Sequence, residues 1–235
     1  MRKIQLVLVA LIVLILSAFK ADHVITIYMI GDSTMSNKPL EGNNQERGWG
    51  HVLGSFFTED VRVENHAMNG RSSKSFIDEG RWETVVNKIR PGDYVFIQFG
   101  HNDEKPQPER HTDPGTTFDE NLRKFVRETR AKGGIPVLFN SIVRRNFGVN
   151  PDAVAADDIR PEKDEAVVEG DTLIDTHGKY LESPRNVAKE MDVCFIDLNQ
   201  ATKKLVESYG VEGSKKLFMW IPADTYAACP KGRQD

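Results

Sequence analysis

Residues 24–34 read VITIYMIGDST, and this stretch decides the fold. Its first seven residues are mostly apolar and rich in β-branched side chains, which is typical of a buried β-strand. Turn-forming residues, Gly31-Asp32-Ser33-Thr34, then stop the run. The stretch therefore predicts a strand over 24–30 that ends in a tight turn.

The same pattern recurs along the chain and alternates with amphipathic stretches. In one of these, Phe118, Leu122, Phe125, Val126 and Thr129 recur at helical spacing. Such alternation predicts an α/β fold, a parallel sheet covered on both faces, in one doubly wound domain. We expect strands at 24–30, 61–64, 94–99, 136–143 and 193–198, helices at 49–59, 72–89, 117–132 and 175–192, and the longest loop at 144–174.

Length and composition are typical of an ordinary globular protein. The chain has 235 residues, 39% of them hydrophobic and 28% charged, which excludes collagen-like and low-complexity classes. Length alone allows one large domain or two small ones. Lys and Arg number 31 against 35 Asp and Glu, a net charge of −4, so no nucleic-acid partner is expected.

The N-terminus is typical of a secretory signal segment. Arg2 and Lys3 precede a run of 15 residues from Ile4 to Ala18 that only Gln5 and Ser17 interrupt. The run is short for a membrane span, which needs about 20 apolar residues, although an uncleaved anchor stays open. We predict a signal peptide at 1–21, an exported protein (periplasmic or extracellular) with no stable membrane span, and a domain at 22–235. Removing 1–21 takes away three basic residues and no acid, so the net charge falls to −7.

Two cysteines do not make a disulfide framework, even in an exported protein. Cys194 lies in the apolar run Val-Cys-Phe-Ile, where a buried free thiol is favoured over a disulfide. Cys229 stands in a loop-like context, Ala-Ala-Cys-Pro. Whether the two pair stays open.

Several well-defined motifs are absent from the sequence. It has no P-loop, no G-x-G-x-x-G, no H-E-x-x-H, no paired C-x-x-C and no G-x-S-x-G. Nucleotide binding, zinc hydrolysis and the common α/β-hydrolase arrangement therefore lose support. In an open parallel sheet, ligands bind outside the carboxyl ends of the strands. The residues that follow each strand are the ones to consider.

Polar blocks follow the first three strands. They are Gly31-Asp32-Ser33-Thr34, then Asn69-Gly70-Arg71-Ser72, then Gly100-His101-Asn102-Asp103. Each block alone is more often turn or capping chemistry than a site. Their occurrence together, in order and each after a strand, predicts a functional site.

These blocks resemble the SGNH (GDSL-like) hydrolase superfamily. Together with Arg47-Gly48-Trp49-Gly50 and with Gln98-Phe99 before the third block, they look like its rhamnogalacturonan acetylesterase branch. The resemblance runs from about Val24 to the last residue. It implies a single domain with parallel strand order 2-1-3-4-5 that deacetylates a plant cell-wall polysaccharide without a cofactor or metal.

The resemblance also implies site residues. Ser33 would be the nucleophile, and the backbone N–H groups of Ser33 and Gly70 with the side-chain amide of Asn102 would stabilise the oxyanion. Ester hydrolysis requires a nucleophile and hydrogen-bond donors of these kinds, because its tetrahedral intermediate needs fixed donors about 3 Å from its developing charge. Arg71 and His101 would line the substrate site.

Other polar and aromatic residues near the blocks have simpler interpretations. Asp32 adjoins Ser33, but neighbouring side chains on an extended segment point to opposite faces, so a structural role is favoured over a triad acid. Ser72 is typical of a helix N-cap. Arg71 contacts either an acidic sugar or a surface carboxylate. Trp49 is either buried or a platform for sugar stacking, with burial the commoner case.

The family's general base is a histidine in an Asp-x-x-His motif near the C-terminus. Asp235 looks like the first residue of that motif, and the histidine three positions on is absent. Serine hydrolases without their base keep only about 10³–10⁴-fold catalysis over water. His101 is the best substitute, although a supporting role suits it better, and His51, His66, His111 and His177 are expected to be structural or surface residues. We expect a fragment of an acetylesterase cut short at Asp235.

Three functions stay open. The first is a serine esterase that removes O-acetyl groups from pectic rhamnogalacturonan or a related polysaccharide. The second is an inactive carbohydrate-binding remnant, because the histidine is missing. The third is a lipase or thioesterase of the same superfamily, which ranks lower because the sequence has no long apolar lid segment.

Overall fold

Five parallel strands form the centre of the protein, in the order β2-β1-β3-β4-β5. The computed structural model describes residues 24–41, 44–147, 173–225 and 230–232, so the predicted signal segment, most of the 144–174 loop, Cys229 and Asp235 lie outside it. The sheet confirms the predicted α/β fold and strand order. The strands are β1 (Ile25–Gly31), β2 (Val61–Asn65), β3 (Tyr94–Gln98), β4 (Ile135–Phe139) and β5 (Cys194–Ile196).

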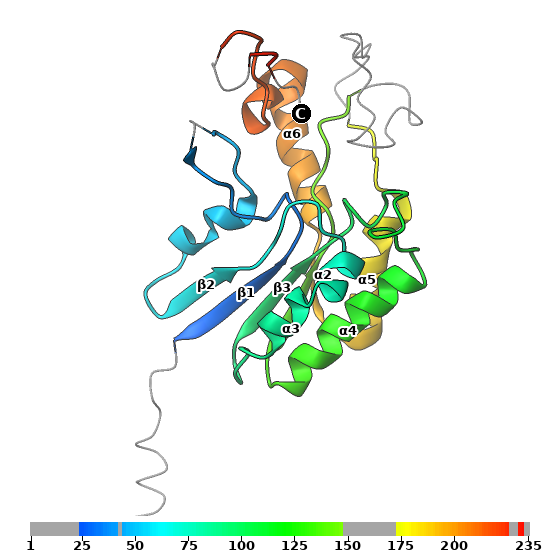
Figure 1. Ribbon diagram of the computed structural model, residues 1–235. Helices are drawn as coiled ribbons and strands as arrows, with labels where there is room; N and C mark the ends of the chain where they lie inside the picture. Colours follow the sequence, from blue (N-terminus) through cyan, green and yellow to red (C-terminus); the bar gives the residue numbers. More distant parts are fainter. Residues whose placement is uncertain (1–23, 42–43, 148–172, 226–229, 233–235) are drawn as a thin grey trace, which may run out of the picture.

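One face of the sheet carries four helices, which lie together in front of the strands (Figure 1). The alternate residues Tyr28, Ile30, Val95, Ile97 and Leu138 point to this face and form the main core with them. All five residues predicted to form the apolar face of one helix, from Phe118 to Thr129, are buried. The four helices are α2 (Ser73–Asp78), α3 (Arg81–Val86), α4 (Thr117–Ala131) and α5 (Glu182–Met191).

The other face carries two short 3₁₀ helices, η2 (Trp49–His51) and η3 (Leu53–Phe56). Their side chains pack on Ile27 and Met29 of β1 and form a second, smaller core. A Cβ on Gly48 would lie 2.2 Å from the carbonyl oxygen of Ser36, so only glycine lets this segment approach the turn after β1 so closely.

Some predicted helices differ in extent. The 72–89 stretch divides at Gly80, whose φ of 70° is left-handed and ends the first helix. The 49–59 stretch forms only η2 and η3, and the 175–192 stretch forms η5 (Gly178–Leu181) followed by α5. A helix that the sequence pattern did not indicate, α6 (Leu198–Ser214), begins where the Asp197 side chain accepts from the Gln200 N–H, and η6 (Lys215–Leu217) follows it.

Helix α6 extends away from the carboxyl edge of the sheet, toward the top of Figure 1. Val206 on this helix packs with Val143, Phe147 and Leu173 in a third apolar cluster, separate from the two on the sheet faces. The residues that follow β4 are thereby fixed beside the same edge.

Cys194 is not buried, contrary to the prediction. It is a free, exposed cysteine on β5. In the sheet Cys194 lies beside Val137, on the face that η2 and η3 cover over β1. β5 is the edge strand on the other side of the sheet, away from these two 3₁₀ helices. Cys194 and Ile196, which is 41% exposed, therefore remain open to solvent.

Within the described ranges, no helix combines the length and the apolar character that crossing a lipid bilayer requires.

The main core depends on aromatic packing around α4, so we predict a large loss of stability for Phe125→Ala. Phe125 is 0% exposed and packs with Trp82 and Phe99, at ring-centroid distances of 5.0 and 5.5 Å. Its removal should lower the free energy of unfolding by about 3–5 kcal/mol. Urea unfolding measures this. Phe56→Ala is the control, because Phe56 is 78% exposed and should change stability by less than about 0.5 kcal/mol.

Candidate active site

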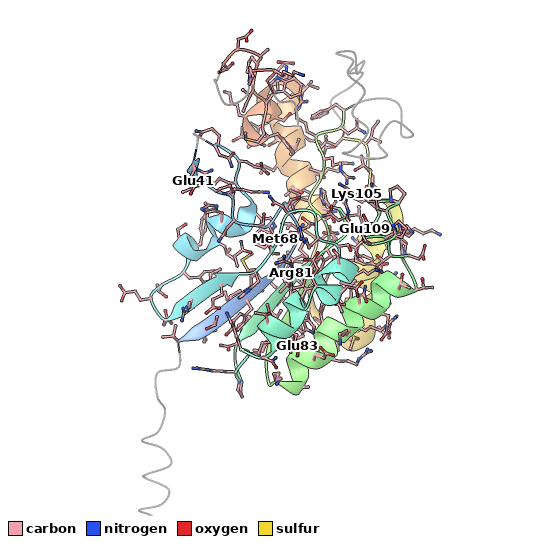
Figure 2. The ribbon with its side chains drawn as sticks, in the orientation of Figure 1. Glu41, Met68, Arg81, Glu83, Lys105 and Glu109 are labelled. Atoms are coloured by element: carbon pink, nitrogen blue, oxygen red, sulfur yellow. The ribbon has the colours of Figure 1, made fainter. Side chains whose placement is uncertain are left out.

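The loops after β1, β2 and β3 meet at the carboxyl edge of the sheet. Gly31, the last residue of β1, pairs in register with Gln98 of β3. Its carbonyl oxygen accepts a 3.0 Å hydrogen bond from the N–H of Met68, in the loop after β2. Figure 2 shows Met68 and Lys105, from the loops after β2 and β3, at this edge. The strand order 2-1-3 thus brings together the three blocks that follow these strands.

Asp32 shapes the turn that carries Ser33. Its Oδ1 accepts from the backbone N–H and the hydroxyl of Thr34, at 2.9 and 2.8 Å, and its carbonyl oxygen accepts from the Ser36 N–H at 3.1 Å. The predicted structural role of Asp32 is confirmed. Ser33 is partly exposed, and within the described part of the chain neither its hydroxyl nor its N–H has a hydrogen-bond partner. Both groups are therefore available to a ligand.

Gln98 and Trp49 support the same turn from the sheet. Gln98 Nε2 donates to Thr34 Oγ1 at 2.8 Å, and Trp49 Nε1 donates to Gln98 Oε1 at 2.6 Å. The Trp49 ring lies against Phe139, with the centroids 5.7 Å apart. Trp49 is half-buried and hydrogen-bonded within the protein, so the packing interpretation is favoured over a sugar platform.

The loop after β2 is fastened to the turn after β1 through Asn69. Asn69 Oδ1 accepts from Ser36 Oγ at 2.6 Å and from Lys38 Nζ at 2.7 Å. Lys38 also pairs with Glu46 at 2.8 Å, and its side chain is only 2% exposed. The next residue, Gly70, has a φ of 74°, a left-handed conformation that favours glycine.

Asn102 and Asp103 hold the third block against the second. Asn102 is 3% exposed, and its Nδ2 donates to the Arg71 carbonyl oxygen at 3.1 Å. An amide nitrogen has two hydrogens, so this bond leaves one. Asp103 accepts from the Ser73 N–H, the Gly100 N–H and the Thr112 hydroxyl, at 3.0, 3.1 and 2.9 Å. The sequence pattern alone indicates no role for Asp103, although its place beside Asn102 in the third block is a usable signal.

Asp103 is fully buried. Burial raises the pKa of its carboxyl to about 7, against the opposite effect of the hydrogen bonds from Ser73 and Thr112. Four donors make five hydrogen bonds to its two oxygens, and an amide could not accept them in the same way because an amide has one acceptor atom instead of two.

Arg71 faces acidic groups of the protein itself. Its Nε donates to both carboxylate oxygens of Glu79, at 3.1 and 3.0 Å, and its Nη1 donates to the Asn69 carbonyl oxygen. Of the two contacts considered for Arg71, the structure shows the one with a surface carboxylate. A cavity of about 380 Å³ adjoins these groups, lined by Gly70, Arg71, Lys74, Glu79, Glu109 and Arg110 among others.

No described histidine contacts Ser33. His51 Nδ1 accepts from the Lys38 N–H, His66 pairs with Glu64, and His111 lies near Asp113 and the Lys105 carbonyl. His177 is 3% exposed with both ring nitrogens engaged, by Glu104 and the Ile142 carbonyl.

His101 is buried as well, at 7% exposed. Its ring packs on His177, with the centroids 4.4 Å apart, and its Nδ1 has no partner within the described residues. Burial and the nearby charge of His177 hold the pKa of His101 well below its ordinary value.

No three His, Cys, Asp or Glu side chains in the described ranges are placed to hold a metal ion. The groups that meet at this edge are a serine hydroxyl, backbone N–H donors and a side-chain amide. Such groups suit acyl transfer through an oxyanion.

Comparisons with known proteins agree with this chemistry. The family model described as the GDSL-like Lipase/Acylhydrolase family matches residues 29–210. The chain is 39% identical over 211 residues to the rhamnogalacturonan acetylesterase RhgT of Bacillus subtilis, covering 90% of this chain and 81% of that protein. It is 31% identical over 202 residues to the probable rhamnogalacturonan acetylesterase YesY of the same organism, covering 86% and 80%.

Among solved structures, the chain resembles protein YxiM of Bacillus subtilis, with a TM-score of 0.66 and 26% identity. The match covers 83% of this chain and 49% of that one, so the chain spans about half the length of YxiM.

The Lys38–Asn69 contact should contribute to stability, because it fastens two loops in a buried place. We expect Lys38→Met to lower the free energy of unfolding by about 1–3 kcal/mol, the cost of leaving buried polar partners unsatisfied. Urea unfolding measures the change. Lys74→Met is the matched control, since Lys74 pairs with Asp78 on the surface and should change stability by less than about 1 kcal/mol. Equal losses in the two variants would contradict the role given to Lys38.

His101 should make the protein less stable in acid. Its pKa in the folded protein lies below the ordinary value of 6.5, so below about pH 6.5 the unfolded chain binds more protons and stability falls as the pH falls. One proton corresponds to at most about 1.4 kcal/mol per pH unit. Unfolding free energies between pH 7 and 5 should therefore fall less steeply for His101→Gln than for the wild type. His111→Gln is the control, because the His111 side chain is 40% exposed, and its unfolding free energy should change with pH as that of the wild type does. Parallel curves for His101→Gln would refute the prediction.

Proposed function

Because the chain belongs to the GDSL-like lipase/acylhydrolase family, we propose that it is a serine esterase that removes O-acetyl groups from pectic rhamnogalacturonan or a related acetylated polysaccharide. The family and the rhamnogalacturonan acetylesterase relatives confirm the resemblance predicted from the three blocks. The observation that carries the proposal is the Ser33 turn, whose free hydroxyl and N–H lie at the edge shared with the Gly70 and Asn102 loops.

In the proposed mechanism, the Ser33 hydroxyl oxygen attacks the carbonyl carbon of the acetyl ester. The carbonyl oxygen becomes an oxyanion that accepts from the N–H groups of Ser33 and Gly70 and from the second amide hydrogen of Asn102. Collapse of this intermediate expels the sugar alkoxide, which takes up a proton, and leaves an acetyl group on Ser33. Water then attacks the acetyl-serine ester through a second oxyanion and releases acetate.

The base that receives the Ser33 proton is not among the described histidines. By the resemblance, we propose Asp235, a residue outside the described ranges, as the aspartate that orients this base. The lack of any described histidine at Ser33 favours a second candidate, a protein that binds acetylated polysaccharide without turning it over.

We propose a polysaccharide instead of a lipid as the substrate. Apart from Gly70, the residues that line the adjoining cavity are charged or polar in type, and such side chains can form hydrogen bonds with sugar hydroxyls. We further propose that residues 1–21 export the protein, since pectic polysaccharides lie outside cells; these residues are not described by the structure.

Ser33→Ala and Asn102→Ala test the function. With acetate release from acetylated pectin and from p-nitrophenyl acetate as the measurement, Ser33→Ala should abolish turnover. Asn102→Ala should lower kcat by about 10²–10³-fold, the usual cost of one oxyanion donor, while costing only about 1 kcal/mol of stability.

Ser55→Ala is the control for both variants, because Ser55 is exposed and donates only to the Val52 carbonyl. Turnover that survives Ser33→Ala would overturn the esterase mechanism. Binding of acetylated pectin with no Ser33-dependent turnover would support the second candidate instead.

A further inference from the structure

The peptide between Asn69 and Gly70 carries one of the proposed oxyanion donors, the Gly70 N–H. It is the middle peptide of a β-turn, because the Arg71 N–H donates to the Met68 carbonyl oxygen at 3.3 Å. Within this turn φ is positive at Gly70, at 74°, and not at Asn69. This is the φ pattern of a type II turn.

A type II turn has an alternative form in which the middle peptide is reversed. At the third residue φ is about +80° in type II and about −90° in type I, and both forms keep the hydrogen bond that closes the turn. Glycine adopts both values without steric cost, so Gly70 does not itself fix the peptide. In the type I form the Asn69 carbonyl oxygen would point to the side to which the Gly70 N–H now points. An acceptor there would repel an oxyanion instead of stabilising it.

The Arg71 side chain restrains this peptide. Its Nη1 donates to the Asn69 carbonyl oxygen at 2.9 Å. The peptide is trans and planar, so its C=O and N–H point in opposite directions. A hydrogen bond that fixes the carbonyl therefore also fixes the direction of the Gly70 N–H. In the reversed form the carbonyl would turn away from the guanidinium, and this hydrogen bond would be lost.

Glu79 holds the guanidinium in place. Arg71 Nε donates to both carboxylate oxygens of Glu79, at 3.1 and 3.0 Å, so one planar group bonds a carboxylate and the Asn69 carbonyl at the same time. Glu79 also accepts from Arg81 Nε at 2.6 Å. The main-chain carbonyl oxygen of Arg71 accepts separately from the Asn102 amide at 3.1 Å. Arg71 thus contacts the residues that carry two of the three proposed donors.

We propose that Arg71 is a positioning residue of the active site, whose side chain keeps the Gly70 N–H directed at the oxyanion by holding the Asn69 carbonyl oxygen. The catalytic meaning of this inference rests on the proposed esterase function, whereas the orientation of the peptide does not depend on turnover. The role differs from direct binding of an acidic sugar, because the guanidinium acts on the protein's own backbone and so affects every ester substrate alike.

Arg71→Met tests the positioning role with p-nitrophenyl acetate, a substrate without a carboxylate. We expect kcat to fall by about 10- to 100-fold, less than the loss of a whole oxyanion donor, because the turn still visits its type II form. KM should change by less than about two-fold, because the oxyanion contacts are made only in the transition state. The carbonyl of residue 71 that accepts from Asn102 belongs to the main chain and remains in the variant.

Arg81→Met is the matched control. Arg81 also donates to Glu79, and its side chain is 31% exposed against 33% for Arg71, but in the described part of the chain it makes no hydrogen bond to Asn69. Its kcat should stay within about two-fold of the wild-type value, as expected for a surface ion pair. A loss in Arg71→Met no larger than that in Arg81→Met would refute the positioning role. Normal hydrolysis of p-nitrophenyl acetate with a raised KM on acetylated pectin would also refute it, since that result indicates a direct sugar contact.

Nuclear magnetic resonance on the full ¹³C,¹⁵N-labelled chain measures the peptide orientation without any need for turnover. In a type II turn the amide hydrogen of the third residue lies close to the α-hydrogen of the second, and in a type I turn it does not. The nuclear Overhauser effect between the Asn69 α-hydrogen and the Gly70 amide hydrogen should be strong in the wild type and in Arg81→Met. It should be weaker in Arg71→Met. Equal intensity in all three proteins would overturn the proposal.

Glu79→Ala provides a second test if Arg71→Met does not fold. It removes the carboxylate that holds the guanidinium, so kcat and the same Overhauser effect should both fall, by less than in Arg71→Met. Wild-type values of both would overturn the proposal. Absence of Ser33-dependent turnover in the wild type would count against the esterase function alone, and the resonance measurements would then decide this inference.

Discussion

The buried carboxylate of Asp103 is the constraint on which the site depends. It accepts from the backbone and side chain of Ser73, at the start of α2, from the Gly100 N–H directly after β3, and from Thr112 further along the same loop. These bonds fix the loop after β2 relative to the loop after β3. The Asn102 amide, one residue away, then reaches the Arg71 carbonyl, beside Gly70. Without a carboxylate at position 103, these donors would lose the acceptor that they share, and the second and third blocks would lose their common anchor.

The first block is fastened to the second by a different set of contacts. Ser36 and Lys38 both donate to Asn69, and the Met68 N–H donates to the end of β1. Hydrogen-bond donors that are fixed before substrate arrives do not have to be reorganised during the reaction, which is how an oxyanion site lowers an activation barrier. The polar contacts at this edge therefore have two effects. They replace the hydrogen bonds to water that the buried groups lose on folding, and they hold the donors in place.

The sequence was sufficient to predict the parallel sheet and the three blocks, because strand periodicity and turn residues are local signals and the blocks stand at strand ends. The strand order was implied by the family resemblance. The sequence was not sufficient for features that depend on distant neighbours. Whether Cys194 is buried depends on what covers β5, and the buried contact of His177 with Glu104 joins residues 73 positions apart. Helix α6 was missed because its N-cap, Asp197, lay inside a stretch assigned to the fifth strand. The division of 72–89 at Gly80 is local, and the glycine itself was the available signal.

The central claim is that Ser33 is the nucleophile of this chain. Covalent capture tests it most directly: the folded protein is incubated with an aryl organophosphonate, which reacts with activated serines, and the modified residue is mapped by mass spectrometry. The account predicts one adduct per molecule, on Ser33, and none after unfolding in urea, because the free amino acid side chain is a weak nucleophile. An adduct on another serine, such as Ser36, or no adduct on the folded protein, would contradict it.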